Sequence, residues 1–418
     1  HKMMLHDHLL GGSIMEMGDT IFMFLCTLLV FIMTPGIALF YGGMLRSKNM
    51  LSTTMHSYTA IALVSIQWVF LGYTLAFGKD VFGVIGGLDF IGLKNTGFET
   101  LNGTIPSGLF MLFQMMFAIL SVAILSGSIA ERMKFGPFII FILLWTTLVY
   151  DPLAHMIWGG GFLSQLGILD FAGGNVVHIS SGISGLIAAI LLGKRSNAKN
   201  STPNSLPLAI LGAALIWVGW FGFNVGSALT FNSIAMNAFI STMVASAAGA
   251  VGWSFVEWTT KRKPTVLGAV SGAISGLVSI TPACGFVEIF ASLPIGFIGG
   301  IVCFYGVTAI KQKLGYDDTL DAFGLHGIGG IWGGMATGLF ATTKVNEAGA
   351  NGLFYGDPKH LLTECMGILF TMIFSVVITF LILKGIQTFT SLRVKPEQEM
   401  IGLDLSIHGE KAYERPIL

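Results

Sequence analysis

The chain has 418 residues and no net charge, and 53% of its residues are hydrophobic while only 11% are charged. A soluble protein of this length needs far more charge to cover its surface, so the composition excludes a soluble globular chain and predicts a polytopic membrane protein. With equal numbers of basic and acidic residues, the chain also lacks the basic excess that is typical of nucleic-acid-binding proteins.

Apolar windows of about 20 residues identify membrane spans. We count eleven, at roughly residues 20–44, 51–77, 106–129, 135–150, 171–193, 207–228, 233–257, 265–283, 287–310, 322–341 and 361–385. The predicted fold is all-α, with an outer N-terminal segment (1–18), a helical domain (19–390) and a cytoplasmic tail (391–418). Four cysteines lie in apolar segments without metal-site spacing, and we expect no metal and no cofactor.

The basic residues predict the orientation of the chain. With the N-terminus outside, the outer segments hold only five of the 22 Lys and Arg residues, namely Lys2, Lys79, Lys94, Lys344 and Lys359. Because cytoplasmic loops carry an excess of Lys and Arg, we expect the C-terminal tail to lie in the cytoplasm.

Spans 1–5 and 6–10 have the features of an internal duplication. An odd number of spans in each half inverts the second half relative to the first, and both halves end on a span that contains a histidine, His178 and His326. Inverted repeats place working sites near the bilayer midplane, where the halves meet. We expect the eleventh span to pack diagonally across the outside of the bundle.

The two histidines are the leading functional candidates. Ionisable groups at membrane depth are costly and usually face a bundle interior or a pore. One interpretation is a core histidine bound to a backbone carbonyl, and another is metal ligation, which needs three or four ligands. Matching places in the two halves favour a third: His178 and His326 bind each other, as donor and acceptor, and line a narrow apolar lumen. Such a pair suits a small, polar, proton-carrying substrate.

Asp170 precedes a Gly-Gly pair and the first histidine. Its carboxylate is either a cation ligand or, as we prefer, a cap for the exposed N–H groups of the following helix. Asp321 is the expected counterpart of Asp170 in the second half, again as a cap.

Aromatic residues flank the same route. Phe113 and Phe117 are one turn apart on span 3, Trp158 follows span 4, and Trp220, Phe223 and Ser227 lie on span 6. Aromatics commonly face lipid or the membrane interface. If these rings and a hydroxyl converge instead, they form a cation–π box for a small cation.

The polar tail after Arg393 carries GLD at 402–404 and HGEKAY at 408–413. It is either a disordered terminus or, as its spaced Gly, His and aromatic residues suggest, a docking segment.

Taken together, several motifs closely resemble the Amt/Mep/Rh family of ammonium transporters, in particular its Amt branch. They are PGIALFYGG at 35–43, AHMIWGGG at 154–161, DFAGGNVVH at 170–178, GWFGFN at 219–224, TPACG at 281–285 and FGLHG at 323–327. The resemblance covers about residues 19–414.

The resemblance implies a homotrimer in the plasma membrane of a bacterial or archaeal cell (the inner membrane where there are two), with one narrow pore per subunit. Phe117, Trp158 and Ser227 would form the outer ammonium site, Phe117 and Phe223 the gate, and His178 and His326 the twin-histidine pair. Asp170 would be a structural carboxylate near the outer site, while Phe113 and Trp220 would line the vestibule or pore. The cytoplasmic face would be open to a PII signalling protein of the GlnK type.

The implied function is transport rather than enzymatic catalysis. NH4+ would be recruited outside and deprotonated, NH3 would pass the histidines, and the proton would be lost or carried separately; methylammonium would serve as an analogue. The alternative is an ammonium sensor of the same fold, coupled to a signalling domain and without net transport. One departure from the family pattern is Asp151, an acid placed beside the expected outer mouth.

Overall fold

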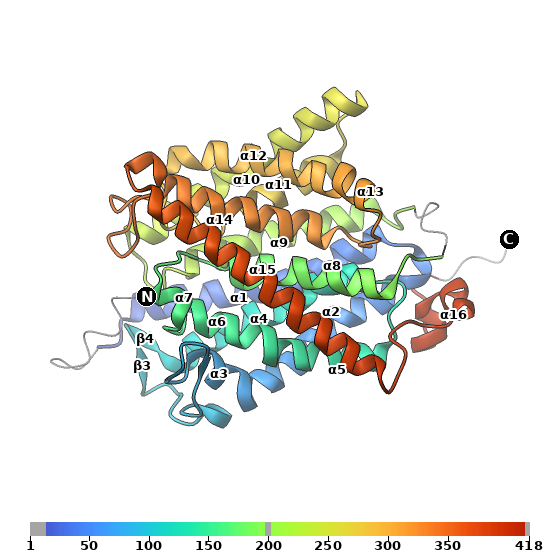
Figure 1. Cartoon of the computed structure of the whole chain (residues 1–418), viewed down its shortest axis with the longest axis horizontal. Coiled ribbons are helices and arrows are strands. Elements are labelled where there is room, and N and C mark those ends of the chain that lie inside the picture. The colour runs from blue at the N-terminus through green and yellow to red at the C-terminus, as the bar shows by residue number, and fades with distance from the viewer. Residues whose placement is uncertain (1–13, 197–201, 414–418) are drawn as a thin grey trace.

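The computed structural model describes residues 14–196 and 202–413, so most of the predicted N-terminal segment, Lys199 and the last five residues lie outside the described residues. The described chain is mostly helical (Figure 1). Four two-residue strands form two antiparallel hairpins, β1 (Asp80–Val81) with β2 (Ile85–Gly86) and β3 (Leu101–Asn102) with β4 (Ile105–Pro106).

The first half contains the helices α1 (Met17–Met44), η2 (Ser47–Asn49), α2 (Met50–Gln67), η3 (Trp68–Gly72), α3 (Tyr73–Phe77), η4 (Ile91–Leu93), α4 (Ser107–Ile129), α5 (Phe135–Trp145), η5 (Thr146–Tyr150), α6 (Asp151–Ile157), α7 (Phe162–Gln165), η6 (Gly174–Ile179) and α8 (Ser180–Leu192). The second half contains α9 (Leu206–Gly226), α10 (Ser233–Lys261), α11 (Val266–Ile280), η8 (Ile289–Ala291), α12 (Ser292–Tyr305), η9 (Gly306–Ile310), α13 (Lys311–Leu314), η10 (Phe323–Gly327), α14 (Ile328–Phe340) and η11 (Leu353–Tyr355). Then follow α15 (Pro358–Gln387), α16 (Pro396–Ile401) and η12 (Asp404–His408).

Among the described residues, nine helical segments are long and apolar enough to cross a membrane, which confirms the polytopic α-helical class. The helix α11 is apolar but shorter, and η10 with α14 makes a further helical segment at the expected tenth position. The count of eleven spans stays a prediction.

The packing of equivalent elements follows the predicted duplication. The first helices of the two halves, α1 and α9, pack along each other, η6 packs on α14, and η10 packs on α8. Glycine permits the close approach of α1 and α9: a Cβ atom on Gly43 would lie 2.5 Å from the Ala209 backbone nitrogen. Small residues at such interfaces let helices pack tightly without a hydrophobic driving force.

Single π-helical turns interrupt corresponding spans of both halves: η5 and η9 in the fourth span of each, and η6 and η10 in the fifth. Such turns are rare in proteins overall, and those that occur often lie at functional sites. Both histidine-bearing segments are therefore wound differently from the helices around them.

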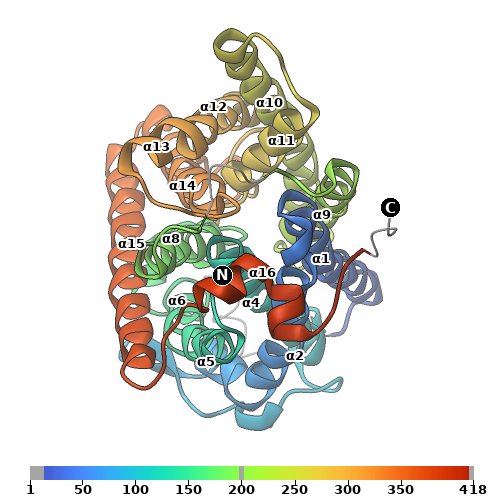
Figure 2. The ribbon, with the colours of Figure 1, turned by 90° about the vertical axis from the view of Figure 1, so that its right-hand side faces the viewer.

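The last long helix, α15, crosses obliquely over the other helices, as predicted for the eleventh span (Figure 1). Seen from the end that carries α16, α15 lies at the edge of the bundle (Figure 2). It is tied to the bundle where Thr379 donates to Ser184 of α8 at 2.8 Å, and Ser184 also accepts from Trp145 Nε1 at 2.9 Å.

Candidate functional site

The two histidines from opposite halves meet at the centre of the bundle. His178 of η6 and His326 of η10 place their Nδ1 atoms 3.2 Å apart, and the ring centroids are separated by 5.2 Å with an angle of 30° between the planes. Both side chains are buried. In such a contact one ring nitrogen donates and the other accepts, so only one of the two Nδ1 atoms carries the shared proton.

A series of aromatic rings leads from the histidines toward one end of the molecule. The rings of Phe223 and His178 are 5.9 Å apart, and Phe223 stacks on Phe117 at 4.2 Å with an interplanar angle of 20°. Phe117 in turn meets Trp158 edge to face at 5.9 Å. Three residues that the sequence predicted as an outer site and a gate are thus in direct contact.

The two remaining aromatic candidates also join this group. Phe113 contacts Phe117 edge to face at 4.9 Å. Trp220 stacks on His178 at 5.3 Å and donates its Nε1–H to the Thr281 hydroxyl at 2.9 Å. That hydrogen bond fixes the indole plane, and the indole in turn supports one face of the imidazole.

Beyond the stacked phenylalanines lies a small pocket at the end of the molecule that carries the β hairpins. It is lined by Gln114, Phe117, Trp158, Phe171, Ser227 and Leu229. Ser227 donates its hydroxyl proton to the Phe223 carbonyl at 2.9 Å, which leaves its oxygen able to accept. Aromatic faces and hydroxyl oxygen are the groups that attract a small cation.

Sequence reasoning missed Gln114, Phe171 and Leu229 as pocket residues. Gln114 lies on α4 and is buried, and within residues 14–196 and 202–413 its Oε1 atom has no hydrogen-bond partner. The available signal was its position as a lone amide in a long apolar run. Phe171 and Leu229 gave no such signal, because a Phe or Leu in an apolar segment has many places to pack.

Asp170 caps the segment that carries His178. Its Oδ1 accepts from the N–H groups of Gly173 and Gly174 at 2.8 and 2.6 Å, and its Oδ2 accepts from Asn175 and Val176 at 2.7 and 3.2 Å. The first N–H groups of a helix have no partner inside it, so one buried carboxylate satisfies four of them. The geometry matches a cap, and every Asp170 carboxylate contact is to backbone N–H.

The expectation that Asp321 caps the second segment is wrong. The carboxylate of Asp318 accepts from the Phe323 N–H at 2.8 Å, whereas Asp321 forms an ion pair with Lys311 at 2.6 Å. Asp321 lies in a turn just before η10, with a backbone φ of +58°. Proximity in sequence suggested the nearer acid, but the turn brought the farther one to the N-terminus.

A second, larger pocket lies on the other side of the histidines. It is lined by Phe40, Met44, Trp253, Glu257, Lys261, Thr265, Leu267, Gly268, Ser271, Val307, Leu320, Asp321 and Leu325. Leu325 directly precedes His326, so the series of contacts runs from the outer pocket through the stacked phenylalanines and the histidines to this inner pocket. Of the two pockets as the described residues line them, only the second includes charged side chains, namely Glu257, Lys261 and Asp321.

Asp151 does not line the outer pocket. It is fully buried at the start of α6, where its Oδ2 accepts from Gln67 Nε2 at 2.7 Å. Gln67 directly precedes η3 and Asp151 directly follows η5, so the hydrogen bond joins two π-helical turns. The placement of this acid beside the outer mouth is therefore corrected to a contact between helices.

Comparison with known proteins decides the family. The model of the Ammonium Transporter Family matches residues 21–413. The chain belongs to the ammonium transporter family.

The transporter is 61% identical over 402 residues to an ammonium transporter of Bacillus subtilis (strain 168), covering 96% of this chain and 99% of that protein. The crystal structure of Saccharomyces cerevisiae Mep2 superposes with a TM-score of 0.85 at 34% identity, covering 92% of each chain. A structure described as a sensor Amt protein also reaches a TM-score of 0.85, at 28% identity, and covers 93% of this chain and 98% of that one.

The end of the transporter that carries the inner pocket is held by an ion-pair network. Glu131, between α4 and α5, accepts from Arg46 Nε at 2.9 Å and from Arg195 at 2.7 Å, and Arg195 also pairs with Asp317 at 2.8 Å. Burial raises the pKa of Glu131, but the bond from Arg46 and the charge of Arg195 outweigh it and lower that pKa. The bonds and charge of Arg195 likewise outweigh burial at Asp317 and lower its pKa to about 2.

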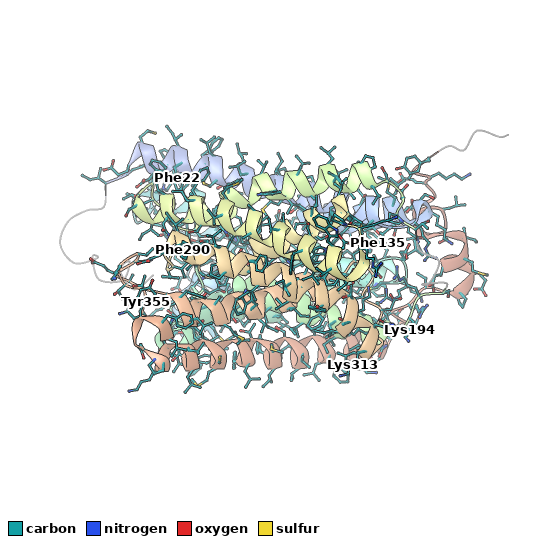
Figure 3. All side chains as sticks on the ribbon, turned by 90° about the horizontal axis from the view of Figure 1, so that it is seen from above. Phe22, Phe135, Lys194, Phe290, Lys313 and Tyr355 are labelled. Atoms are coloured by element: carbon teal, nitrogen blue, oxygen red, sulfur yellow. The ribbon has the colours of Figure 1, made fainter. Side chains whose placement is uncertain are left out.

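The C-terminal tail docks beside this network, since the Asn49 side chain donates to Glu131 and accepts from the Leu403 N–H. Asp404 caps the N-terminus of α2 by accepting from the Leu51 and Ser52 N–H groups at 3.0 and 2.7 Å. Glu399 accepts from the Ser196 N–H at 2.6 Å and pairs with Arg393 at 2.8 Å. Figure 3 places Lys194 and Lys313 toward this end, opposite Phe22, Phe290 and Tyr355. The tail between Arg393 and Asp404 is therefore docked, and farther along the Tyr413 hydroxyl donates to Met50 Sδ at 3.4 Å.

Proposed function

We propose that this transporter carries ammonium across the membrane by separating NH4+ into NH3 and a proton. NH4+ binds between Phe117, Trp158 and Ser227, and loses its proton beside the stacked rings of Phe117 and Phe223. NH3 then passes His178 and His326 to the inner pocket. The observation that carries the proposal is the contact between the two Nδ1 atoms, which lies between an aromatic pocket and a charged one.

The outer pocket supports binding of the cation. The edge of Phe117 meets Trp158 at 5.9 Å, and Ser227 lines the same pocket. Cation–π contacts contribute about 0.5–2 kcal/mol per ring, the larger value when the site is shielded from water. An ammonium ion fits this chemistry because it offers both charge and N–H donors.

The stacked phenylalanines support loss of the proton at this point. With ring centroids 4.2 Å apart, Phe117 and Phe223 close the route to a hydrated ion. Moving an unpaired ion into a low-dielectric medium costs tens of kcal/mol in the idealised limit, whereas neutral NH3 avoids that cost. The rings open to admit the small neutral molecule and close behind it.

The histidine pair supports passage of NH3 rather than a simple apolar channel. The Nε2 atom of His178 is buried and has no hydrogen-bond partner among the described residues. A neutral imidazole nitrogen can donate to NH3 or accept from it, which offsets the loss of water. The same nitrogens can exchange a proton along the route, so the pair also supplies a path for the proton released outside.

We further propose an outer N-terminus and a cytoplasmic C-terminal tail, because the basic residues concentrate at the end that bears the tail. The family resemblance supports a homotrimer in the plasma membrane, and the docked tail and ion-pair network form a cytoplasmic surface on which a PII-type protein could bind. Transport is favoured over sensing because identity to the Bacillus subtilis transporter is 61%, against 28% to the sensor Amt protein.

The test is to measure current and uptake on one reconstituted preparation. Ammonium pulses on a solid-supported membrane should give a transient inward current, and the same vesicles should take up labelled methylammonium. Uptake without current would reduce the proposal to gas conduction. If a preparation that binds ammonium shows no uptake and no current, transport is overturned and the sensor is favoured.

A further inference from the structure

The peripheral helix α15 carries a buried acid that the transport route does not use. Glu364 lies on this 30-residue apolar helix and is 0% exposed. A carboxyl group at membrane depth is costly and usually has a functional partner.

Glu364 binds the loop that leads to the outer site. Its Oε1 atom accepts from the Leu169 N–H at 2.6 Å. Three residues farther along α15, Gly367 has no side chain, and a Cβ atom there would collide with the side chain of buried Ile168. The hydrogen bond and this close fit hold residues 168 and 169 against α15.

The next residue in that loop is Asp170, which makes two contacts essential to the site. Its backbone carbonyl accepts from Trp158 Nε1 at 2.8 Å, and its carboxylate caps the segment that bears His178. A displacement of Leu169 would therefore reach both the indole of the outer pocket and the helix of the first histidine.

The environment of Glu364 contains two other titratable groups. On its own helix, His360 places Nε2 3.6 Å from Oε1 of Glu364 and is 5% exposed. From the loop, the Asp170 carboxylate faces the same region, but all its contacts are to backbone N–H. The second carboxylate oxygen, Oε2, has no hydrogen-bond partner in the part of the chain that the structure describes. The bond that Glu364 does make is thus the one to the Leu169 N–H.

We propose that Glu364 is a positioning residue for the outer ammonium site, acting through Leu169 and Asp170. Its carboxyl oxygen holds the loop so that the Asp170 carbonyl orients the Trp158 indole for the cation. The inference rests on the proposed function, because it assigns Glu364 to the affinity of that outer site. In this role the Glu364 side chain acts by accepting the hydrogen bond from the Leu169 N–H, and not by exchanging a proton.

Two substitutions separate acceptance of a hydrogen bond from ionisation. Glu364→Gln keeps an acceptor oxygen for the Leu169 N–H and removes the ionisable group, so methylammonium uptake should keep its KM within about twofold. Glu364→Leu removes the acceptor and should raise KM by about fivefold or more, with a smaller change in maximal rate. The matched control is Thr371→Val, two turns along the same face. The buried Thr371 hydroxyl has no hydrogen-bond partner among the residues that the structure describes, so this change should leave KM unchanged.

A double substitution tests the route of action. Trp158→Phe removes the N–H that binds the Asp170 carbonyl, so its effect on KM should overlap with that of Glu364→Leu instead of multiplying it. Multiplicative effects would overturn the shared route. A loss of uptake in Glu364→Gln as large as in Glu364→Leu would overturn the positioning role and point to proton transfer by Glu364.

The outcomes also separate this inference from the proposed function. If Trp158→Phe changes KM and Glu364→Leu does not, the positioning role fails and the outer site stands. If neither variant changes KM while both proteins elute as the wild type does on size exclusion, the outer site itself is wrong.

Discussion

The two histidine-bearing segments, η6 and η10, each present one histidine to the shared contact, but different side chains hold the start of each segment. In the first half, the carboxylate of Asp170 alone satisfies four N–H groups at the start of η6. In the second half, the work is divided: Asp318 accepts from one N–H group of η10, and Asp321 pairs with Lys311.

The difference follows from what surrounds each segment. The start of η6 is enclosed by apolar helices, and polar backbone there has to be satisfied inside the protein. The start of η10 lies beside the inner pocket and the ion-pair network, where Lys311 and Arg195 supply cations. The inverted repeat preserves the histidine and the π-helical turn but not the chemistry that holds them.

The largest effect is expected from removing the carboxylate at the start of each histidine-bearing segment, which tests the difference between them directly. Asp170→Ala leaves four buried donors without a partner, each worth about 1–3 kcal/mol, so we expect little folded protein. Asp318→Ala removes a single N–H contact and should cost only about 1–3 kcal/mol. Yield and thermal midpoint by size-exclusion chromatography after heating would measure both. Equal losses of yield and thermal midpoint in the two variants would show that both carboxylates stabilise the fold to the same extent.

The second-largest effect is expected at the contact between His178 and His326, which both halves share. His178→Leu and His326→Leu each remove the same hydrogen bond and should reduce methylammonium uptake by roughly 10- to 100-fold, which corresponds to about 1–3 kcal/mol. The double variant should be little worse than either single one, because the bond can be lost only once. Uptake rates in proteoliposomes, normalised to protein content, provide the measurement; full additivity would argue that each ring acts alone.

A smaller effect sharpens the role of the first half. Trp158→Leu removes one ring of the outer pocket and should raise the KM for methylammonium by roughly 2- to 30-fold, as about 0.5–2 kcal/mol of cation–π energy is lost. The same change leaves a cavity at a buried position and removes the hydrogen bond to the Asp170 carbonyl, so the thermal midpoint should fall, but by less than in Asp170→Ala. A drop in maximal rate with unchanged KM would contradict the recruitment role.

The smallest effect concerns the inner end and depends on pH. Because the pKa of Asp317 is lowered to about 2, below the ordinary value of about 3.9, its pairing stabilises the fold fully above about pH 4 and is lost as the pH falls toward 2. Asp317→Asn should therefore lower the free energy of unfolding at pH 7 by on the order of 1 kcal/mol. Thermal midpoints measured between pH 2 and 8 should approach those of the wild type only at the acidic end, as Asp317 becomes protonated in the folded state. A constant difference across that range would exclude the ion pair as the cause.

The sequence by itself determined the membrane class, the approximate positions of the spans and the two histidine-bearing segments. Those properties are local: a span needs about 20 apolar residues, and each helix satisfies its own backbone whatever it packs against. The order of motifs then indicated the family, and an isolated Asp before a Gly-Gly pair indicated the cap at Asp170.

Only the tertiary structure decided which atoms meet. His178 and His326 are 148 residues apart, and their contact through Nδ1 depends on how the two halves pack. The choice of Asp318 over Asp321 followed from a turn with positive φ, and the contact of Glu364 with Leu169 from the oblique path of α15. Hydrophobicity places a helix in the membrane without fixing its rotation or its neighbour, because lipid and protein interior are equally apolar; side-chain packing and buried hydrogen bonds make that selection.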